Sequence, residues 1–429
     1  MRAPFSTSGV IAGCSDVSTW LADCKPVLTS PEDRMALEID TRPPPTIDPK
    51  PALPDVPPPV SPPLTSEGAG SVPTLIHDEP LARLRVVDAA RAVPAPEAPV
   101  VEPPLPPGHT SEHRSWLRLS WRAKGLIQRA LSALPGGMEL HYLMQRIGGG
   151  LAHFDRECDG KVEDWRLMAT QLRGANVDLT TATFVEVGTG WYPTFPLCLY
   201  LAGASRVLTY DTTRHMRSDM VRRLVARLVH HVPMIARVSG TSEIEVEARR
   251  AALARALGRG ATLHDATWEV VDYRAPASAA DTALAPCSVD VVFSNSVLEH
   301  VPPDALHAVF REAWRVLRAG GLMFHSVNCG DHYAYTDPSI DQLHYLAYSE
   351  KRWARWNNAF LYQNRLRSVE FTEAAREVGF AIERDTSRAK PERLAQLERI
   401  TVDPCFAGYT REQLAITSID FIARKPASR

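Results

Sequence analysis

The chain has 429 residues, more than a single domain usually contains, so we expect one folded domain and an additional segment. Hydrophobic residues make up 45% and charged residues 23% of the sequence, which is ordinary for a soluble globular protein. The formal net charge of −2 gives no electrostatic reason to expect a nucleic acid as partner.

The scattered cysteines are most simply explained by a reducing cytoplasm, where we expect the protein to be located. The 7 cysteines are scattered and none belongs to a Cys-x-x-Cys pair, which argues against a structural zinc site and against a disulfide framework. No apolar run approaches the roughly 20 residues that cross a bilayer. Ile11-Ala12-Gly13-Cys14 resembles a lipoprotein cleavage box, but the stretch before it is too short and polar for a signal peptide.

Proline dominates the first part of the chain. Most of the 35 prolines precede Gly108, in runs such as Pro103-Pro104-Leu105-Pro106-Pro107. Proline lacks an N–H donor and restricts φ, so we expect residues 1–110 to be disordered or extended, without a core. This segment is either a docking tract for the aromatic grooves of partner proteins or a solvated tail, and its composition favours the tail.

A basic amphipathic helix is predicted over Ser115–Leu134, ended by Pro135-Gly136-Gly137. Such a helix can lie on an anionic membrane surface. It can also cap a neighbouring domain, which we favour because a folded region follows directly. Met138–Leu179 is predicted to be helical as well, with a break at three consecutive glycines, so residues 111–180 form a predicted helical cap.

Strand and helix signals alternate from residue 181 to residue 426. The expected strands are Ala182–Val187, Arg206–Tyr210, Trp268–Val271, Val289–Ser294, Leu322–Val327, Phe380–Glu383 and Leu414–Ala423. The expected helices are Phe195–Ala202, Asp304–Leu317, Thr372–Val378 and a long region from His215 to Arg259 that is split around Gly240. This alternation predicts an α/β fold with a doubly wound, mainly parallel, seven-stranded sheet.

A glycine turn follows the first expected strand. Gly188 and Gly190 allow a tight turn and a close approach of the backbone to a ligand. Asp211 ends the next strand, about 20 residues further on, where a carboxylate can accept hydrogen bonds from both hydroxyls of a ribose. Pro193 stands where a dinucleotide site needs a third glycine, and it removes an N–H that a phosphate would use. The site therefore suits a nucleoside without phosphates.

Three segments resemble one family. Glu186-Val187-Gly188-Thr189-Gly190 resembles the first motif of class I S-adenosylmethionine-dependent methyltransferases. Val289–Val301 resembles the fourth-strand motif of the broad small-molecule group in that superfamily, and Asp304–Leu322 resembles its next helix, Gly-Gly turn and fifth strand. The resemblance covers most of Ala182–Val327, and it implies a Rossmann-like methyltransferase fold with S-adenosyl-L-methionine as cofactor.

The resemblance also implies roles for individual residues. Four residues of the first motif would surround the methionine moiety of the cofactor: Glu186, Gly188, Thr189 and Gly190. Asp211 would hold the ribose, Asp272 and Tyr273 would contact the adenine, and Asn295 would face the sulfonium and the acceptor. The helical insertion at about 215–260 is longer than the single helix usual there, so Asp265 competes with Asp272 for the adenine.

The region after the fifth strand is where loops that face the acceptor are expected. Its many aromatic, amide and histidine side chains suit a polar, ring-bearing small molecule or a glycan. In the other interpretation, Trp353, Trp356 and Tyr362 pack a lid helix. Arg365 and Arg367 are candidates to pair with a phosphate or carboxylate of the acceptor.

A hydroxyl acceptor benefits from a general base near neutrality, and histidine fits this role. His332, next to Asp331, is the first candidate and His300 is the second. A metal ion held by Asp331, His332, Asp337 and His344 is an alternative way to lower the pKa of the acceptor hydroxyl. The spacing of these four residues is irregular, so no metal is expected.

These observations predict a cytoplasmic methyltransferase with its catalytic domain over residues 181–426. The acceptor is expected to be small or glycan-like and to be methylated on oxygen. Methylation of nitrogen or carbon by the same fold is one alternative, and a non-catalytic cofactor-binding scaffold whose proline tract recruits partners is another. The insertion either mediates dimerisation or shapes the acceptor cleft, and the sequence leaves the oligomeric state open.

Overall fold

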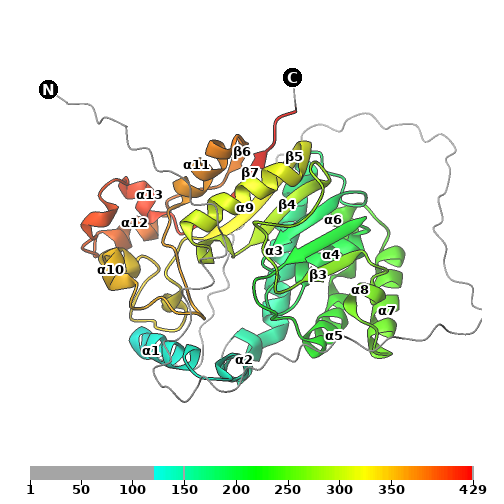
Figure 1. Cartoon of the computed structure of the whole chain (residues 1–429), viewed down its shortest axis with the longest axis horizontal. Helices are drawn as coiled ribbons and strands as arrows, with labels where there is room; N and C mark the ends of the chain where they lie inside the picture. Colours follow the sequence, from blue (N-terminus) through cyan, green and yellow to red (C-terminus); the bar gives the residue numbers. More distant parts are fainter. Residues whose placement is uncertain (1–119, 148–149, 428–429) are drawn as a thin grey trace, which may run out of the picture. The chain divides into compact units, whose positions relative to one another are not determined.

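A seven-stranded sheet with the order β3-β2-β1-β4-β5-β7-β6 forms the centre of the folded unit (Figure 1). The computed structural model describes residues 120–147 and 150–427, which belong to one unit, residues 96–429. The strands are β1 (Thr183–Val187), β2 (Arg206–Tyr210), β3 (Val271–Arg274), β4 (Val289–Asn295), β5 (Leu317–Asn328), β6 (Ala381–Asp385) and β7 (Ser418–Arg424). Neighbouring strands among β1 to β5 pair in parallel, and β7 runs antiparallel to β5 and β6. The predicted fold is confirmed.

Helices cover both faces of this sheet. One layer contains α3 (Phe154–Gly174), α4 (Thr194–Ala202) and the inserted helices, and the other contains α9 (Pro303–Val316) and α11 (Ser368–Val378). Phe184 faces the first layer and its neighbour Val185 faces the second. Strands buried on both faces need apolar residues at consecutive positions, which explains the uninterrupted apolar runs in the sequence.

Two expected strand positions were wrong for local reasons. β3 begins at Val271 rather than Trp268, because Trp268 and Glu269 have φ values of 48° and 63° and complete a turn after the short helix α8 (Leu263–Ala266). The stretch that precedes β7 forms helix α13 (Arg411–Ala415), since Thr410 and Gln413 make a reciprocal capping box at its start.

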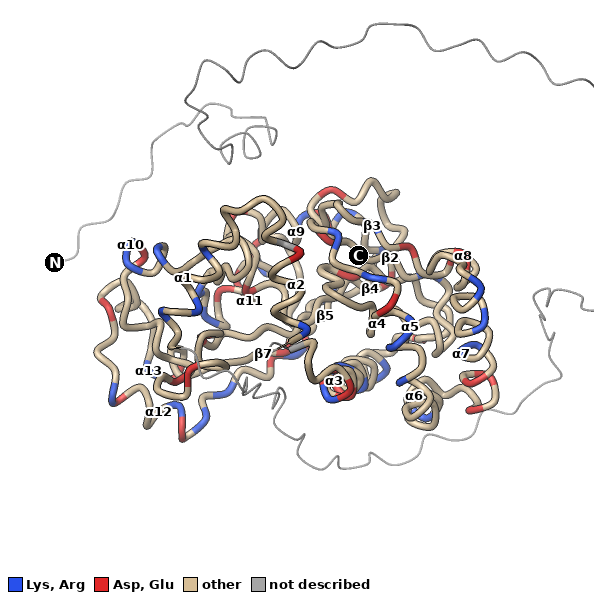
Figure 2. Tube along the Cα trace, turned by 90° about the horizontal axis from the view of Figure 1, so that it is seen from below, with Lys and Arg blue, Asp and Glu red and all other residues tan. Residues whose placement is uncertain are grey.

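The long insertion adds three helices and a short 3-10 turn to the first layer. They are α5 (Ser218–Arg227), η4 (Leu228–His231), α6 (Val232–Ser239) and α7 (Glu243–Gly258). Gly240, with φ of 76°, ends α6 at the predicted break. Figure 2 shows basic and acidic segments intermixed along α3 and α7, which agrees with ion pairs such as Arg227 to Asp159 at 2.6 Å.

The N-terminal helices divide between two cores. α3 buries an apolar stripe that includes Phe154, Val162 and Trp165 in the same core as the sheet, so the expected boundary near residue 180 crosses a continuous core. Helix α1 (Trp121–Ser132) instead joins a second core, while α2 (Gly137–Ile147) and the 3-10 turn η3 (Gly150–His153) connect α1 to α3. Residues 1–119, including the proline-rich segment and the start of the predicted basic helix, lie outside the described residues.

The second core belongs to what we call the accessory lobe, residues 329–367 and 386–417 together with α1. Its short helices are η6 (His332–Tyr335), η7 (His344–Ala347), α10 (Glu350–Trp353), α12 (Pro391–Leu397), η8 (Pro404–Phe406) and α13. Their buried side chains are Tyr333, Leu343, Tyr345, Leu346, Trp353, Leu397, Phe406 and Leu414, and Trp121 of α1 packs among them. The packed-lid interpretation of Trp353 is therefore confirmed.

Two buried arginines hold the accessory lobe together. Arg367 is 0% exposed and donates from Nη1 to the carbonyl of Cys329 at 2.9 Å and from Nη2 to the carbonyl of Leu414 at 3.2 Å. Arg365 donates from Nη1 to the carbonyl of Tyr345 at 3.1 Å and pairs with Glu350. The expectation that these two arginines face the acceptor was wrong, because their guanidinium donors satisfy buried carbonyls.

α1 binds this lobe through one face and leaves some of its apolar side chains exposed. Trp121, Gly125, Gln128 and Leu131 are buried, whereas Leu126 is 61% exposed. Further exposed apolar side chains follow in α2, including Ile147 at 60%. Contact of this region with a membrane surface stays a prediction. Among the helices of residues 120–147 and 150–427, none has the length and apolar composition needed to span a bilayer.

The packing of Trp121 generates a prediction about α1. Its ring lies 4.6 Å from the ring of Trp356, and its backbone N–H donates to Asp337 at 2.8 Å. Replacing a buried tryptophan by alanine costs about 3–5 kcal/mol, so we expect Trp121→Ala to release α1. Hydrogen exchange of residues 121–132 should accelerate strongly. The exposed Leu126→Ala should leave it unchanged, and equal exchange in both variants would contradict the docking of α1.

Candidate active site

The loop that follows β1 requires both of its glycines. Gly188 has φ of 80°, and a Cβ there would lie 2.5 Å from a methyl group of Val297. Gly190 has φ of 72°, and a Cβ there would meet no other heavy atom within 4 Å. Positive φ is strained for residues with a side chain. The loop therefore turns tightly and leaves open space above Gly190, as a bound ligand requires.

Asp211 lies directly beside this loop. Gly190 N–H donates to its Oδ2 at 2.9 Å, and Thr213 N–H donates to its Oδ1 at 3.1 Å. β1 and β2 pair in parallel with Glu186 opposite Thr209, so the carboxyl groups of Glu186 and Asp211 reach the same end and the same face of the sheet. A carboxylate has about four acceptor positions, so Asp211 can still accept hydrogen bonds from a ribose.

Glu186 is buried at the end of β1, with 5% of its surface exposed. The Thr209 hydroxyl donates to its carboxyl group, and the Thr189 hydroxyl is hydrogen-bonded to that of Thr209. Burial raises the pKa of Glu186 to about 8, although the Thr209 hydrogen bond and the charge of Lys161 oppose this rise. The carboxyl group is therefore mostly protonated near neutral pH.

Helix α3 supplies residues that the sequence analysis missed. Glu157 and Lys161 line a pocket of about 160 Å³ whose other walls are Gln145, Leu151, Thr189, Gly190, Trp191 and Tyr192. Asp164 accepts a hydrogen bond from the Asn295 amide nitrogen at 3.1 Å. These three positions are four and three residues apart, so they follow one face of α3 beside its apolar stripe. This spacing was the available signal, but only the packing of α3 shows that the face meets the glycine loop.

Lys161 is the basic residue of this face. Its side chain is half-buried, and its ammonium forms no ion pair with any residue that the structure describes. Its charge acts on the buried Glu186 and lowers the pKa of that carboxyl group. An ammonium in this position can bind a carboxylate of a ligand in the pocket.

Helix α2 covers the glycine loop with aromatic rings. The Trp191 ring lies 5.2 Å from the ring of Tyr142 and 4.9 Å from that of His215. His141, also in α2, stacks on Phe360 with the ring centroids 4.3 Å apart. The N-terminal helices thus form part of the wall of this site.

The structure separates the two residues predicted to contact adenine. Tyr273 is paired with Thr209, so it lies on the same sheet face as Glu186, and its hydroxyl accepts a hydrogen bond from His215 N–H at 3.2 Å. Asp272 is paired with Leu208 on the opposite face and forms an ion pair with Arg274 at 2.9 Å. This geometry does not favour Asp272 as an adenine ligand.

The competing candidate lies elsewhere. Asp265 is exposed on α8, where its carboxylate accepts a hydrogen bond from the Thr262 hydroxyl at 2.7 Å. Asn295 does reach the site from the end of β4. Its amide oxygen Oδ1 is buried and has no hydrogen-bond partner within the described ranges, so it can accept a hydrogen bond from a ligand.

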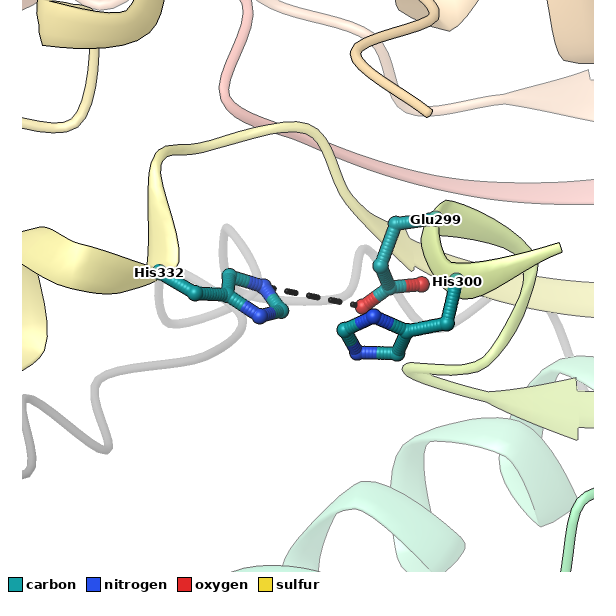
Figure 3. Close-up of side chains that lie close together, drawn as sticks. All are labelled: Glu299, His300 and His332. Carbon is teal, nitrogen blue, oxygen red and sulfur yellow. Dashed lines mark ion pairs between the residues drawn. The ribbon is translucent and has the colours of Figure 1, made fainter. Parts of the chain in front are cut away.

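His300 and His332 come together at the ends of β4 and β5, as Figure 3 shows. Their ring centroids are 4.9 Å apart. Glu299, which the sequence analysis did not single out, joins them, and its Oε1 lies 3.9 Å from His332 Nε2. His300 is the last residue of the short helix η5 (Leu298–His300), and His332 is the first residue of η6. We call these residues the Glu299–His300–His332 cluster.

Asp331, a catalytic candidate and the sequence neighbour of His332, has a different partner. The Asp331 carboxylate pairs with His344 Nδ1 at 2.8 Å and accepts the N–H of Tyr333 at 2.9 Å. Asp337 binds Trp121 instead. The four-residue metal group considered above therefore does not form, and His332 belongs to a different cluster.

Lys124 reaches the acceptor side from helix α1. Burial lowers the pKa of Lys124 to about 8, against the opposing effect of Asp331. Its charge in turn lowers the pKa of both His141 and His332, although burial is the larger cause in each case. The ammonium thus lies within electrostatic reach of both rings, which only the docking of α1 brings about.

The buried carboxyl of Glu186 predicts a pH dependence of stability. Its pKa rises from the ordinary 4.5 to about 8 on folding, so the folded state holds this proton more tightly and loses stability as the pH rises between these values. One pKa unit corresponds to about 1.4 kcal/mol, so the loss should be a few kcal/mol at most. Relative to the parent, Glu186→Gln should become more stable from about pH 5 to about pH 9 in denaturant unfolding. Glu243 is exposed, so Glu243→Gln serves as the control and should show no such trend. An equal trend in both variants would contradict the raised pKa of Glu186.

Comparison with known proteins gives a family match and several similar folds. Residues 229–325 match the family model of a methyltransferase domain, which is less than a quarter of the chain. None of the curated proteins matches the sequence.

Solved structures similar to this chain include an S-adenosylmethionine-dependent methyltransferase from Mesorhizobium loti, with 18% identity, a TM-score of 0.33 and coverage of 59% of this chain and 95% of the other. A SAM-dependent methyltransferase from Methanosarcina mazei is 14% identical, with a TM-score of 0.32 and coverage of 58% and 94%. Geranyl diphosphate methyltransferase in complex with SAM is 16% identical, with a TM-score of 0.34 and coverage of 63% and 90%.

The family match contains most of the insertion, β3, β4, α9 and the first part of β5. It does not include β1 and β2, which carry the glycine loop and Asp211, and the complete sheet has the predicted parallel arrangement of β1 to β5. Residues 229–325 therefore match a methyltransferase domain, and the described residues form the seven-stranded fold that the sequence predicts.

Proposed function

We propose that the protein transfers a methyl group from S-adenosylmethionine to a hydroxyl oxygen of a small polar or glycan-like acceptor. The cofactor supplies a methyl group on a positively charged sulfur. In the transfer, the acceptor oxygen forms a bond to the methyl carbon, the carbon–sulfur bond breaks with its electron pair remaining on sulfur, and the acceptor loses its hydroxyl proton. The protein must therefore align the two molecules. It must also accept the hydroxyl proton or stabilise the negative charge that its loss leaves on the oxygen.

The residues around the glycine loop fit the cofactor. Lys161 would pair with its methionine carboxylate, and Asp211 would accept hydrogen bonds from the ribose. Tyr273 would lie against the adenine, and the unpartnered Asn295 Oδ1 would face the sulfonium and the acceptor. The open space above Gly190 supports this arrangement, because a side chain there would fill it.

Two features support oxygen as the methylated atom. The Glu299–His300–His332 cluster follows directly after the ends of β4 and β5, next to Asn295, where the acceptor of an open α/β sheet binds. A cluster of two histidines and a carboxylate can assist the loss of a hydroxyl proton. The Lys124 ammonium near His332 would stabilise negative charge on the oxygen and would repel a protonated amine.

The aromatic side chains that are only partly buried support a polar acceptor with a ring. Tyr333, Tyr345 and Trp353 are buried in the accessory lobe, so they do not contribute a ring-binding surface. His141, Phe360 and Tyr335 are only partly buried and suit a polar molecule with a ring or an apolar edge.

The single observation that carries the proposal is the position of the cluster, which begins four residues after Asn295, the last residue of β4. The test is to incubate the full chain with S-adenosylmethionine and a panel of hydroxylated metabolites, glycans and amines, and to measure S-adenosylhomocysteine. Turnover only with hydroxyl-bearing acceptors is expected. Turnover only with amines, or cofactor binding without turnover on any acceptor, would contradict oxygen methylation.

Cofactor binding should depend on Asp211. A hydrogen bond to a charged group contributes about 1.5–3 kcal/mol, so Asp211→Ala should weaken binding of S-adenosylmethionine about ten- to a hundredfold. The matched control is Asp265→Ala, which removes an exposed carboxylate. Asp265 is the alternative adenine ligand that the sequence suggests. Calorimetric titration of both variants measures the effect, and equal affinities would argue against Asp211 as the ribose ligand.

Turnover should depend on His332. General acid–base groups contribute about 10²–10⁴-fold in rate, so His332→Ala should lower kcat by a factor in this range while the affinity for S-adenosylmethionine is unchanged. His307 of α9 is a suitable control, because it forms an exposed ion pair with Glu377 of α11 at 3.1 Å. Unchanged kcat in His332→Ala would remove the cluster from the reaction.

A further inference from the structure

The arrangement of the Glu299–His300–His332 cluster suggests how it acts on the acceptor. We propose that these three side chains hold one divalent first-row metal ion, such as zinc, on the acceptor side of the methyltransferase site. The ion's part in catalysis rests on the proposed function, whereas its binding does not.

The three side chains converge from two short helices (Figure 3). Their ligand atoms, one from each residue, all lie within 4.8 Å of one another. Metal–ligand distances of about 2.0–2.2 Å place the donor atoms of one ion about 3–3.5 Å apart, so small side-chain movements complete the site. Two imidazoles and one carboxylate form a donor set that zinc and related ions prefer.

The surroundings orient both imidazoles as ligands. His300 Nδ1 lies 2.6 Å from the carbonyl oxygen of Tyr362, which fixes the proton on Nδ1 and leaves the lone pair on Nε2. His332 Nε2 is buried and has no hydrogen-bond partner among residues 120–147 and 150–427. A buried ring nitrogen without a hydrogen-bond partner can coordinate a metal ion, which would satisfy its lone pair.

The backbone on both sides of the cluster is held in place. Gln363 accepts the His332 N–H at 3.0 Å and donates to the carbonyl of Gly330 at 2.8 Å. Asn364 N–H donates to the carbonyl of Glu299 at 2.9 Å. Both helices are therefore tied to one short segment of the accessory lobe, which preorganises the three donors.

The charges nearby do not prevent binding of a cation. Lys124 opposes it, but the Asp331 carboxylate lies on the residue adjacent to His332 and acts on the same ammonium. Three protein ligands leave coordination positions open. An acceptor with two adjacent oxygen atoms, such as a vicinal diol or a hydroxyketone, can occupy them, and the ion would lower the pKa of its hydroxyl group.

The experiment measures metal binding directly on the full chain. The purified protein is stripped with a chelator and titrated with Zn²⁺ by calorimetry and with Co²⁺ by visible absorption, whose bands report the ligand geometry. We expect one equivalent bound by the parent and by His307→Ala. In His300→Ala, His332→Ala and the conservative Glu299→Gln, this equivalent should be lost, while unchanged affinity for S-adenosylmethionine shows that the variants are folded.

The outcomes separate this inference from the proposed function. Absence of the bound equivalent, or its persistence in all three variants, would overturn the metal site. If hydroxyl methylation then continues after chelation, His332 acts as the base itself and the proposed function stands. If the metal binds through these residues but no hydroxyl acceptor is methylated, the metal site stands and the proposed function fails.

Discussion

The parallel pairing of β1 with β2 and β4 is the constraint on which the site depends. Because Glu186 is paired with Thr209, the loop after β1 ends beside Asp211, and the N–H of Gly190 donates to that carboxylate. A shift by one residue would turn Glu186 to the other face of the sheet and would separate these groups. Apolar residues of β1 on each face, such as Phe184 and Val185, are buried by a layer of helices, which holds the register.

Burial of polar groups follows from this arrangement and gives the site its electrostatic character. Burial raises the pKa of Glu186 to about 8, and the hydrogen bond from the Thr209 hydroxyl offsets only part of this rise. Lys161 lies beside the glycine loop, and Lys124 acts on His332 of the Glu299–His300–His332 cluster. Both ammonium groups come from helices that precede the sheet in the chain. The site is thus assembled between the sheet and the N-terminal helices.

The accessory lobe carries His332 of the Glu299–His300–His332 cluster. It is built from two insertions, one after β5 and one between β6 and β7, and from α1. The buried Arg367 joins the first insertion to the second through carbonyl groups of both. His332 lies near the start of the first insertion, so the position of the Glu299–His300–His332 cluster depends on the packing of this lobe. Trp121 anchors α1 there, which also fixes Lys124.

The sequence by itself determined the fold, and it predicted the cofactor and the glycine turn that would bind it. Strand and helix periods report which faces are buried, and the glycine turn with its distant aspartate depends on local backbone conformation and on the ends of adjacent strands. Asn295 and His332 were candidates because they follow expected strands, but only the structure shows that His300 and His332 lie together.

Only the tertiary structure decided which charged residues meet. Asp272 and Tyr273 are neighbours in sequence, but strand alternation sends them to opposite faces. Asp331 stands next to His332 and yet pairs with His344. Arg365 and Arg367 have a structural role, because they donate to buried carbonyl groups. Lys161 and Lys124 reach the site because the helices that carry them pack against it. Side-chain partners are set by contacts between segments far apart in the chain, and no local pattern in the sequence records those contacts.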